Sequence, residues 1–307
     1  MKTLAHKLIS VASGVPSIAT GDVVICNVDL AMIHDSGGPR RVKPILERLN
    51  RSVWDKDKVV VVTDHYVPAT NAETQAIQAL TKEWVREQDI EKFYDEQGIC
   101  HVVLPERGHL SPGKFCVGGD SHSPTGGAFG AYMFGIGATE MAGVLATGTI
   151  WIKVPETILI RWHNQLTSFV TAKDMMLATC RKIGMGGGRY QAIQFAGDAV
   201  RQLGMQDRMT LSNMAAELGA QAGLIAPDET TIDYIQKAGG TVTEEWRSYQ
   251  IETVETDDNL LSFDAAALAP QIAAPHSPAN ADDAEAFKNT RFDLASIGAC
   301  TGAKYVD

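Results

Sequence analysis

Runs of consecutive apolar residues predict buried strands at several places along the chain. Residues 58–63 hold four successive valines, so both faces of this strand should be covered, as in a parallel sheet between helices. Residues 115–117 and 157–160 are similar short runs, and 294–297 is a weaker one. Polar residues follow these runs, which is the pattern of buried strands that end at a protein surface.

Apolar positions at helical spacing predict helices between the strands. The helix predicted over 71–97 opens with Thr70 and Glu73, which match a capping box, and it carries an apolar face. Residues 129–145, crowded with glycine and alanine, and residues 209–222 are two further predicted helices. The first residues of the chain fit a short amphipathic helix better than a signal peptide. Strands that alternate with helices favour an α/β architecture.

These elements predict three units along the chain. We expect a first α/β domain over 1–155, a second over 156–238, a linker over 239–285 and the start of a truncated third domain over 286–307. The linker is predicted because its sequence is rich in Ala, Pro and Asp and shows little periodicity. A third domain that ends early should leave apolar residues near 294–297 uncovered.

The composition narrows the classes of function. The chain has 307 residues with 27 Lys+Arg against 37 Asp+Glu, a formal net charge of −10. This acidic balance argues against a nucleic-acid or membrane-surface binder. The five cysteines are scattered and none is spaced C-x-x-C, which is a poor disulfide framework and favours a reducing compartment, the cytoplasm.

Polar side chains follow three of the predicted strands. Asp64 and His65 follow the valine strand, the acid–hydroxyl–imidazole tripeptide 120–122 follows the second strand, and Cys300 follows the last. Ligands of open α/β sheets bind beyond the carboxyl ends of the strands. Two chemistries stay open from the residues alone. The Asp and His groups, His34 among them, are candidate ligands of divalent metals in a hydrolase, or Cys300 holds an iron–sulfur centre while histidines transfer protons.

Seven short motifs run in order across nearly the whole chain. They are VVTDH at 61–65, GICHVVLPE at 98–106, GDSH at 119–122, GGAFG at 126–130, NMAAE at 213–217, IAPD at 225–228 and IGACT at 297–301. Together these motifs resemble the aconitase superfamily, and most closely the large subunits of 3-isopropylmalate dehydratase and of homoaconitase-type enzymes.

This resemblance implies an activity, a fold and partners. The activity is that of a hydro-lyase on a small 2-hydroxy dicarboxylic or tricarboxylic acid, first of all 3-isopropylmalate in leucine biosynthesis. Homoaconitase-type acids and dimethylmalate or methylmalate are the close alternatives. The fold implied is aconitase-like α/β/α with largely parallel sheets. Family members hold a 4Fe-4S cluster through three cysteines, and its open iron takes the substrate hydroxyl. A small subunit carries the mobile domain with the catalytic serine.

The resemblance also implies roles for individual residues. His65, held by Asp64, would protonate the departing hydroxyl, and His101 would be oriented by Glu217. Cys300 would be an iron ligand. The full set that the resemblance implies is catalytic Asp64, His65, His101, Asp120, His122 and Glu217, substrate-binding His34 and Ser121, and metal-binding Cys300.

Two features depart from the family pattern. Relatives usually read Ser-Cys-Thr-Asn around the first cluster cysteine, where this chain reads Ala-Cys-Thr-Gly at 299–302. The other two cluster cysteines of the family form a downstream C-x-x-C pair, which the 307 residues do not contain. We therefore expect a C-terminally truncated or split large subunit that is inactive alone and holds an incomplete cluster or none. Cys100 and Cys116 are expected in the core, and a noncatalytic carboxylate-binding fragment is the alternative class.

Overall fold

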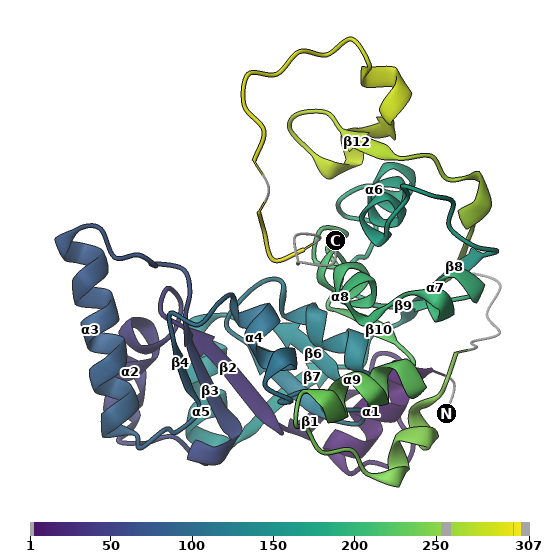
Figure 1. Ribbon diagram of the computed structural model, residues 1–307. Coiled ribbons are helices and arrows are strands. Elements are labelled where there is room, and N and C mark those ends of the chain that lie inside the picture. Colours follow the sequence, from purple (N-terminus) through teal and green to yellow (C-terminus); the bar gives the residue numbers. More distant parts are fainter. Residues whose placement is uncertain (1–2, 253–258, 297, 302–307) are drawn as a thin grey trace.

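Two parallel β-sheets with helices around them form the frame of the protein (Figure 1). The computed structural model describes residues 3–252, 259–296 and 298–301. The predicted α/β class with parallel sheets is confirmed. No helix within these described ranges is long and apolar enough to cross a membrane.

The first sheet has five strands in the order β4-β3-β2-β5-β6, and every neighbouring pair is parallel. Because β2 precedes the other four along the chain, strands are added on both sides of it. The strand order therefore reverses between β2 and β5, and such switch points create ligand crevices at the carboxyl ends of the strands. The strands are β2 (Leu30–His34), β3 (Val59–Thr63), β4 (Phe93–Asp95), β5 (Phe115–Gly118) and β6 (Tyr132–Gly135).

Amphipathic helices and a two-stranded antiparallel ribbon surround the first sheet. Every residue of β2 and β3 is buried, as the run of valines in β3 predicts for a strand covered on both faces. The surrounding elements are α1 (Leu4–Ser13), α2 (Pro39–Leu49), η1 (Lys56–Lys58), α3 (Ala72–Glu87), α4 (Cys100–Glu106), η2 (Ser123–Phe129) and α5 (Ala138–Thr147), with the ribbon of β1 (Val23–Asn27) and β7 (Thr149–Lys153).

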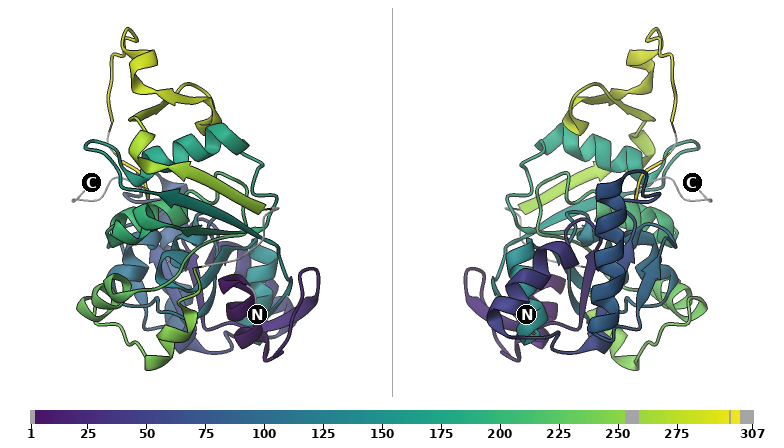
Figure 2. Two further views of the ribbon diagram at one scale, coloured as in Figure 1. Left: turned by 90° about the vertical axis from the view of Figure 1, so that its right-hand side faces the viewer. Right: turned by 90° about the vertical axis from the view of Figure 1, so that its left-hand side faces the viewer.

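The second sheet has four parallel strands in the order β10-β9-β8-β11. A short antiparallel hairpin of β12 and β13 packs on α6 beyond this sheet, and Figure 2 shows it at the far end of the molecule from α1. The elements are β8 (Thr157–His163), α6 (Ala172–Ile183), β9 (Ala192–Ala196), α7 (Asp198–Gln202), α8 (Met205–Asn213), β10 (Ala222–Ile225), α9 (Glu229–Lys237), η3 (Glu244–Tyr249), β11 (Leu260–Asp264), η5 (Ala265–Ala267), β12 (Gln271–Ala273), η6 (Pro278–Asn280), β13 (Ala281–Asp283) and η7 (Ala284–Phe287).

The two sheets are joined through a shared core and through η2. Ala192, Ala222 and Leu224 of the second sheet lie in the same buried cluster as Val59 and Val61 of β3. Close approach is possible because Gly127 has no side chain. A Cβ placed there would lie 1.9 Å from the carbonyl oxygen of Gly223 in β10. The tripeptide 120–122, which leads into η2, is thereby held against the second sheet.

Three predicted helices are partly wrong. The stretch 129–145 contains strand β6 before helix α5, and residues 209–222 hold only the end of α8 before β10 begins. Helix α3 is shorter than predicted, because β4 follows it, and its capping box joins Asn71 to Thr74 instead of Thr70 to Glu73. Short apolar runs that are buried on all sides carry no periodicity that separates a strand from a helix.

The linker predicted over 239–285 is also wrong in part. Strand β11 pairs in parallel with β8, and the β12–β13 hairpin packs on α6. The low hydrophobicity of the segment follows from its place at the edge of the fold, where one face of β11 is half-buried and the other is exposed. The division into domains stays a prediction.

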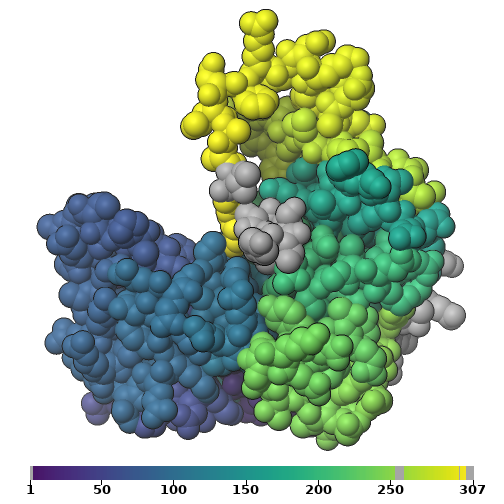
Figure 3. Space-filling view, viewed as in Figure 1, coloured from purple at the N-terminus to yellow at the C-terminus, as the bar shows by residue number. Residues whose placement is uncertain are grey.

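The final predicted strand, 294–297, is not a strand where the structure describes it. Residues 294–296 have no regular structure, and Ile297 lies outside the described residues. Leu294 is 85% exposed and Phe292 is 77% exposed, so apolar side chains are uncovered there as expected. Figure 3 shows the yellow C-terminal segment entering a hollow of the surface, between the part of the molecule built on the first sheet and the part built on the second sheet.

Candidate active site

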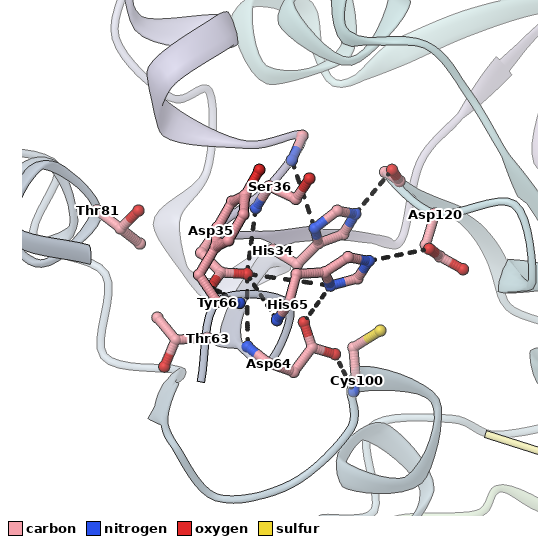
Figure 4. A network of polar contacts seen from close by, with 12 residues as sticks. His34, Asp35, Ser36, Thr63, Asp64, His65, Tyr66, Thr81, Cys100 and Asp120 are labelled. Carbon is pink, nitrogen blue, oxygen red and sulfur yellow. Dashed lines mark hydrogen bonds and ion pairs between the residues drawn. The ribbon is translucent and has the colours of Figure 1, made fainter. Parts of the chain in front are cut away.

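The candidate site lies at the carboxyl ends of β2, β3 and β5, on both sides of the switch point of the first sheet. His34 ends β2, Asp64 and His65 follow β3, and Asp120 follows β5 after one further glycine. Because the strands are parallel, these ends share one edge of the sheet. A hydrogen bond from His34 Nε2 to the carbonyl oxygen of Gly119 (2.9 Å) bridges the β2–β5 crevice directly (Figure 4).

His65 lies between two carboxylates. Its Nδ1 donates to Asp64 Oδ1 at 2.6 Å, and its Nε2 lies 3.5 Å from Asp120 Oδ2. The contacts with Asp120 and with Asp64 raise the pKa of His65 to about 10. The pKa of Asp64 is lowered, since the bonds from His65 and from the main-chain N–H of Cys100 outweigh the effect of its burial. His65 is therefore an imidazolium at neutral pH, able to donate a proton.

Asp120 contacts three histidines and is the hub of the site. Its Oδ1 accepts from His101 Nε2 at 2.6 Å and from the main-chain N–H of His122 at 2.8 Å. Its other oxygen faces His65. Burial opposes ionisation of Asp120, yet the bonds from His101, His122 and His65 hold its pKa well below the usual range. A permanently ionised carboxylate can keep neighbouring imidazoles protonated.

Glu217 contacts a different histidine from the one that the resemblance implied. Its Oε1 accepts from His122 Nε2 at 3.2 Å, while His101 is bonded to Asp120, so the predicted orientation of His101 by Glu217 is wrong. The pKa of His122 is raised, first by Asp120 and then by Glu217. The close packing of η2 on β10 brings His122 to Glu217, and this tertiary contact has no sequence signal.

His34 is buried and neutral. Burial and the neighbouring charge of His65 lower its pKa. Its ring stacks on that of His65, with centroids 3.9 Å apart and planes 9° apart. His34, Asp35, Asp64 and His65 offer atoms within 4.8 Å of one another. However, the nitrogen lone pairs of two parallel stacked rings lie in parallel planes and cannot converge on one ion, which argues against the divalent-metal hydrolase.

Ser121 and Cys300 complete the predicted set. Ser121 Oγ lies 3.1 Å from His122 Nδ1. Asn213 donates through its side-chain amide to Cys300 Sγ (3.3 Å) and to Thr125 Oγ1 (2.9 Å), and it is fully buried. Thr125 in turn donates to the carbonyl oxygen of His122, so hydrogen bonds through Asn213 and Thr125 connect the thiol to His122. Asn213 is missing from the predicted site, although its motif NMAAE was available as a signal.

The cysteines present do not supply the ligands of an iron–sulfur cluster. Cys26, Cys180 and the pair Cys100 and Cys116 lie in three separate core clusters. Burial raises the pKa of Cys26, Cys116 and Cys180 to about 12 and that of Cys100 well above its usual value, which disfavours the thiolate form that binds iron. Cys300 alone among the five is partly exposed. This chain therefore offers one of the three thiolates.

A cavity of about 390 Å³ opens beside Asp120. Its lining includes Asp120 and Ser121 of the predicted site, together with Ile136, Tyr190 and Gln221. The cavity is large enough for a small organic acid. It places such a molecule against one carboxylate and one hydroxyl of the predicted site.

The chain is similar to known proteins over nearly its whole length. The model of the Aconitase family (aconitate hydratase) matches residues 9–305. The 3-isopropylmalate dehydratase large subunit 1 of Methanopyrus kandleri is 43% identical over 100% of this chain and 72% of its own length. The 3-isopropylmalate dehydratase large subunit of Moorella thermoacetica is 35% identical over 99% of this chain and 72% of its own. The "Probable methanogen homoaconitase large subunit" of Methanothermobacter thermautotrophicus is 37% identical, with 99% and 72% covered.

Among solved structures, the holo-form of Thermococcus kodakaraensis aconitase X is similar, with a TM-score of 0.46 and 10% sequence identity. The match covers 85% of this chain and 63% of that one.

Proposed function

The chain belongs to the aconitase family, and from this membership we propose that it is the large-subunit component of a hydro-lyase acting on a small 2-hydroxy acid. The reaction is the removal and return of water, and 3-isopropylmalate is the proposed substrate. Support for this substrate comes from relatives that are named for it and align over the whole of this chain. A relative named as a homoaconitase large subunit makes that activity the second candidate.

The observation that carries the proposal is the position of His65 between Asp64 and Asp120. Hydroxide is a poor leaving group, so dehydration needs an acid that protonates the departing hydroxyl. The two carboxylates keep the imidazole charged, and the raised pKa of about 10 means that the acid is loaded at neutral pH. Asp64 holds Nδ1, and the proton on Nε2 faces Asp120, which is itself one of the residues that line the cavity.

The substrate would lie in the cavity beside Asp120 and Ser121. The Ser121 hydroxyl is placed to bond a substrate carboxylate or hydroxyl, and His122, whose pKa is raised by Asp120 and Glu217, lies beside it as a further donor for an anionic group. Neutral His34 forms the wall behind His65 and excludes water from that face of the ring. Each of these residues lies at or after the carboxyl end of a strand of the first sheet.

We propose that the active enzyme is completed outside this chain. A small subunit is the proposed partner, since the similar proteins are named as large subunits. A family-type 4Fe-4S cluster needs two cysteine ligands besides Cys300, and the 307 residues do not supply them. We expect anaerobic reconstitution of this chain alone to give well below about four irons per chain. The five scattered cysteines, none of them spaced C-x-x-C, support a cytoplasmic, reducing setting.

Turnover by the reconstituted assembly tests the proposal. The experiment combines the chain anaerobically with iron, sulfide and the small subunit of a related enzyme. Formation of the unsaturated acid from 3-isopropylmalate and from homocitrate is then followed by ultraviolet absorbance. The expected result is turnover that requires both proteins and prefers 3-isopropylmalate. Turnover of homocitrate alone would support the second candidate, and binding of either acid without turnover would support the noncatalytic carboxylate-binding alternative.

Two substitutions give the test a matched control. His65→Gln should lower kcat by a factor of about 10²–10⁴, the usual contribution of a positioned general acid. His163→Gln removes a histidine at the end of β8 whose side chain bonds Ser262 in the second sheet, and it should leave kcat unchanged. Equal activity of the His65 variant and the parent protein would contradict the proposed role of His65.

A further inference from the structure

The carboxylate of Asp35 lies fully buried beneath the loop that follows β3. Asp35 is the first residue after β2, and its main-chain N–H donates to the carbonyl oxygen of Val62 in β3 (3.2 Å). Figure 4 shows its side chain reaching from β2 towards the main chain of the loop that carries His65. A buried charge needs bonded partners, so the groups around this carboxylate explain why it is tolerated there.

Three successive residues of that loop donate their main-chain N–H groups to this one carboxylate. Tyr66 donates to Oδ2 at 3.0 Å, and His65 and Asp64 donate to Oδ1 at 3.1 and 3.4 Å. The N–H of Ser36 donates to Oδ1 as well, at 3.1 Å. Bonds from N–H groups to an ionised acceptor are about twice as strong as neutral ones. The carboxylate therefore fixes the main chain of a segment that lies outside the strand.

The position of this segment decides both contacts of the His65 ring. Its Nδ1 is 2.6 Å from Asp64 Oδ1 and 4.0 Å from Asp35 Oδ1, and its Nε2 is 3.5 Å from Asp120 Oδ2. A movement of the loop by about 1 Å would break the hydrogen bond from Nδ1 to Asp64, because N–H···O bonds have donor–acceptor distances of about 2.7–3.2 Å. The stacking of His65 on His34 depends on the same geometry, since His34 directly precedes Asp35.

We propose that Asp35 is a positioning residue for the dehydration, one that holds the 64–66 main chain so that His65 stays between its two carboxylate partners. This inference rests on the proposed function of His65 as the acid, but it concerns a residue with no assigned contact to substrate. Asparagine cannot replace Asp35, because an amide has one acceptor oxygen and its NH₂ group would face N–H donors.

The test is Asp35→Asn in the full chain, with the ring nitrogens of His65 followed by NMR against pH. The expected result is that the pKa of His65 falls from about 10 by at least about one unit. The matched control is Asp174→Asn. Asp174 is a buried carboxylate that accepts the main-chain N–H groups of Thr171 and Gln271, each at 2.7 Å, away from the site. The Asp174→Asn substitution should leave the pKa of His65 unchanged.

Two results would overturn the inference. One is an unchanged His65 titration in Asp35→Asn, and the other is an equal fall in the Asp174→Asn control, which would mean general loosening of the fold. If the Asp35 variant does not fold, hydrogen exchange of the parent chain decides. The amides of His65 and Tyr66 should exchange slowly, although they lie outside the strands, and fast exchange would contradict the proposal.

These measurements do not require turnover. A chain that passes both tests but supports no conversion of a hydroxy acid in the reconstituted assembly with its small subunit would therefore contradict the proposed function and leave the positioning role of Asp35 supported.

Discussion

Asp120→Asn removes the negative charge that lies among His65, His101 and His122, while keeping the size of the side chain. The carboxylate accepts from His101 Nε2 at 2.6 Å and from the main chain of His122 at 2.8 Å, and it lies 3.5 Å from His65 Nε2. An amide oxygen can keep one of these bonds. It cannot provide the negative charge that stabilises the protonated imidazoles, so we expect His65 to lose its proton at a lower pH.

The size of the effect follows from the geometry around His65. The pKa of His65 is about 10, with Asp120 the larger of the two carboxylate contributions and Asp64 the second. One opposite charge within about 4–6 Å changes a pKa by about 1–3. Because the His65 side chain is 36% exposed, solvent screening favours the lower end. We expect the pKa to fall by about one unit in the variant, with Asp64 responsible for the remaining elevation.

NMR titration of ¹⁵N-labelled imidazole rings measures this change directly. The matched control is Asp95→Asn, at the carboxyl end of the neighbouring strand β4, where Asp95 accepts from the Thr63 hydroxyl (2.9 Å) and pairs with Lys82 (2.7 Å). It should leave the titration of His65 unchanged. The reasoning is refuted if Asp120→Asn leaves the pKa of His65 where it is, or if the control lowers it equally.

Three further outcomes are expected. Glu217→Gln should lower the pKa of His122 in the same titration, because Glu217 is the second carboxylate that raises it. Leu145→Ala should lower the urea-measured unfolding free energy by about 2–5 kcal/mol, since Leu145 is fully buried, whereas Leu49→Ala at a 53% exposed position should change it by less than about 0.5 kcal/mol. The folded pKa of His65 lies above its unfolded value, so the contribution of protonated His65 to the unfolding free energy should be complete below about pH 6.5 and be lost as pH rises through about 10. Urea unfolding of the parent chain and of His65→Gln across that range measures this contribution. A difference in unfolding free energy that grew with pH would contradict the prediction.

The parts of the fold that sequence predicts well are those in which burial alone decides the structure. The four valines of β3 can be covered on both faces only inside a parallel sheet, and all are buried. The stretch 129–145 is a harder case, because Tyr132, Met133 and Phe134 form a strand while the residues after Gly137 form a helix. All of these apolar residues are buried against neighbours on several sides, so their spacing does not separate the two structures.

The position of the site could be predicted in the same way. Acids and histidines follow strands that end at one edge, and the strand order reverses between β2 and β5, where His34 reaches Gly119. The roles of Asn213 and Asp35 do not follow from the sequence alone. Asn213 bonds the thiol of Cys300 and Asp35 bonds the main chain of the loop after β3, and each acts on an element that is distant in the sequence. Their roles depend on which elements pack together.

Which carboxylate holds which histidine is a tertiary property of this fold. Glu217 lies 95 residues from His122, and its approach requires η2 to pack on β10 at the contact of Gly127 with Gly223. With η2 in that position, His122 faces Glu217, and His101 on α4 is left to Asp120. A larger residue at position 127 would push η2 away from β10 and separate the first of these pairs. The pairing of acids with imidazoles, and with it the protonation of the site, is therefore set by backbone packing between the two sheets.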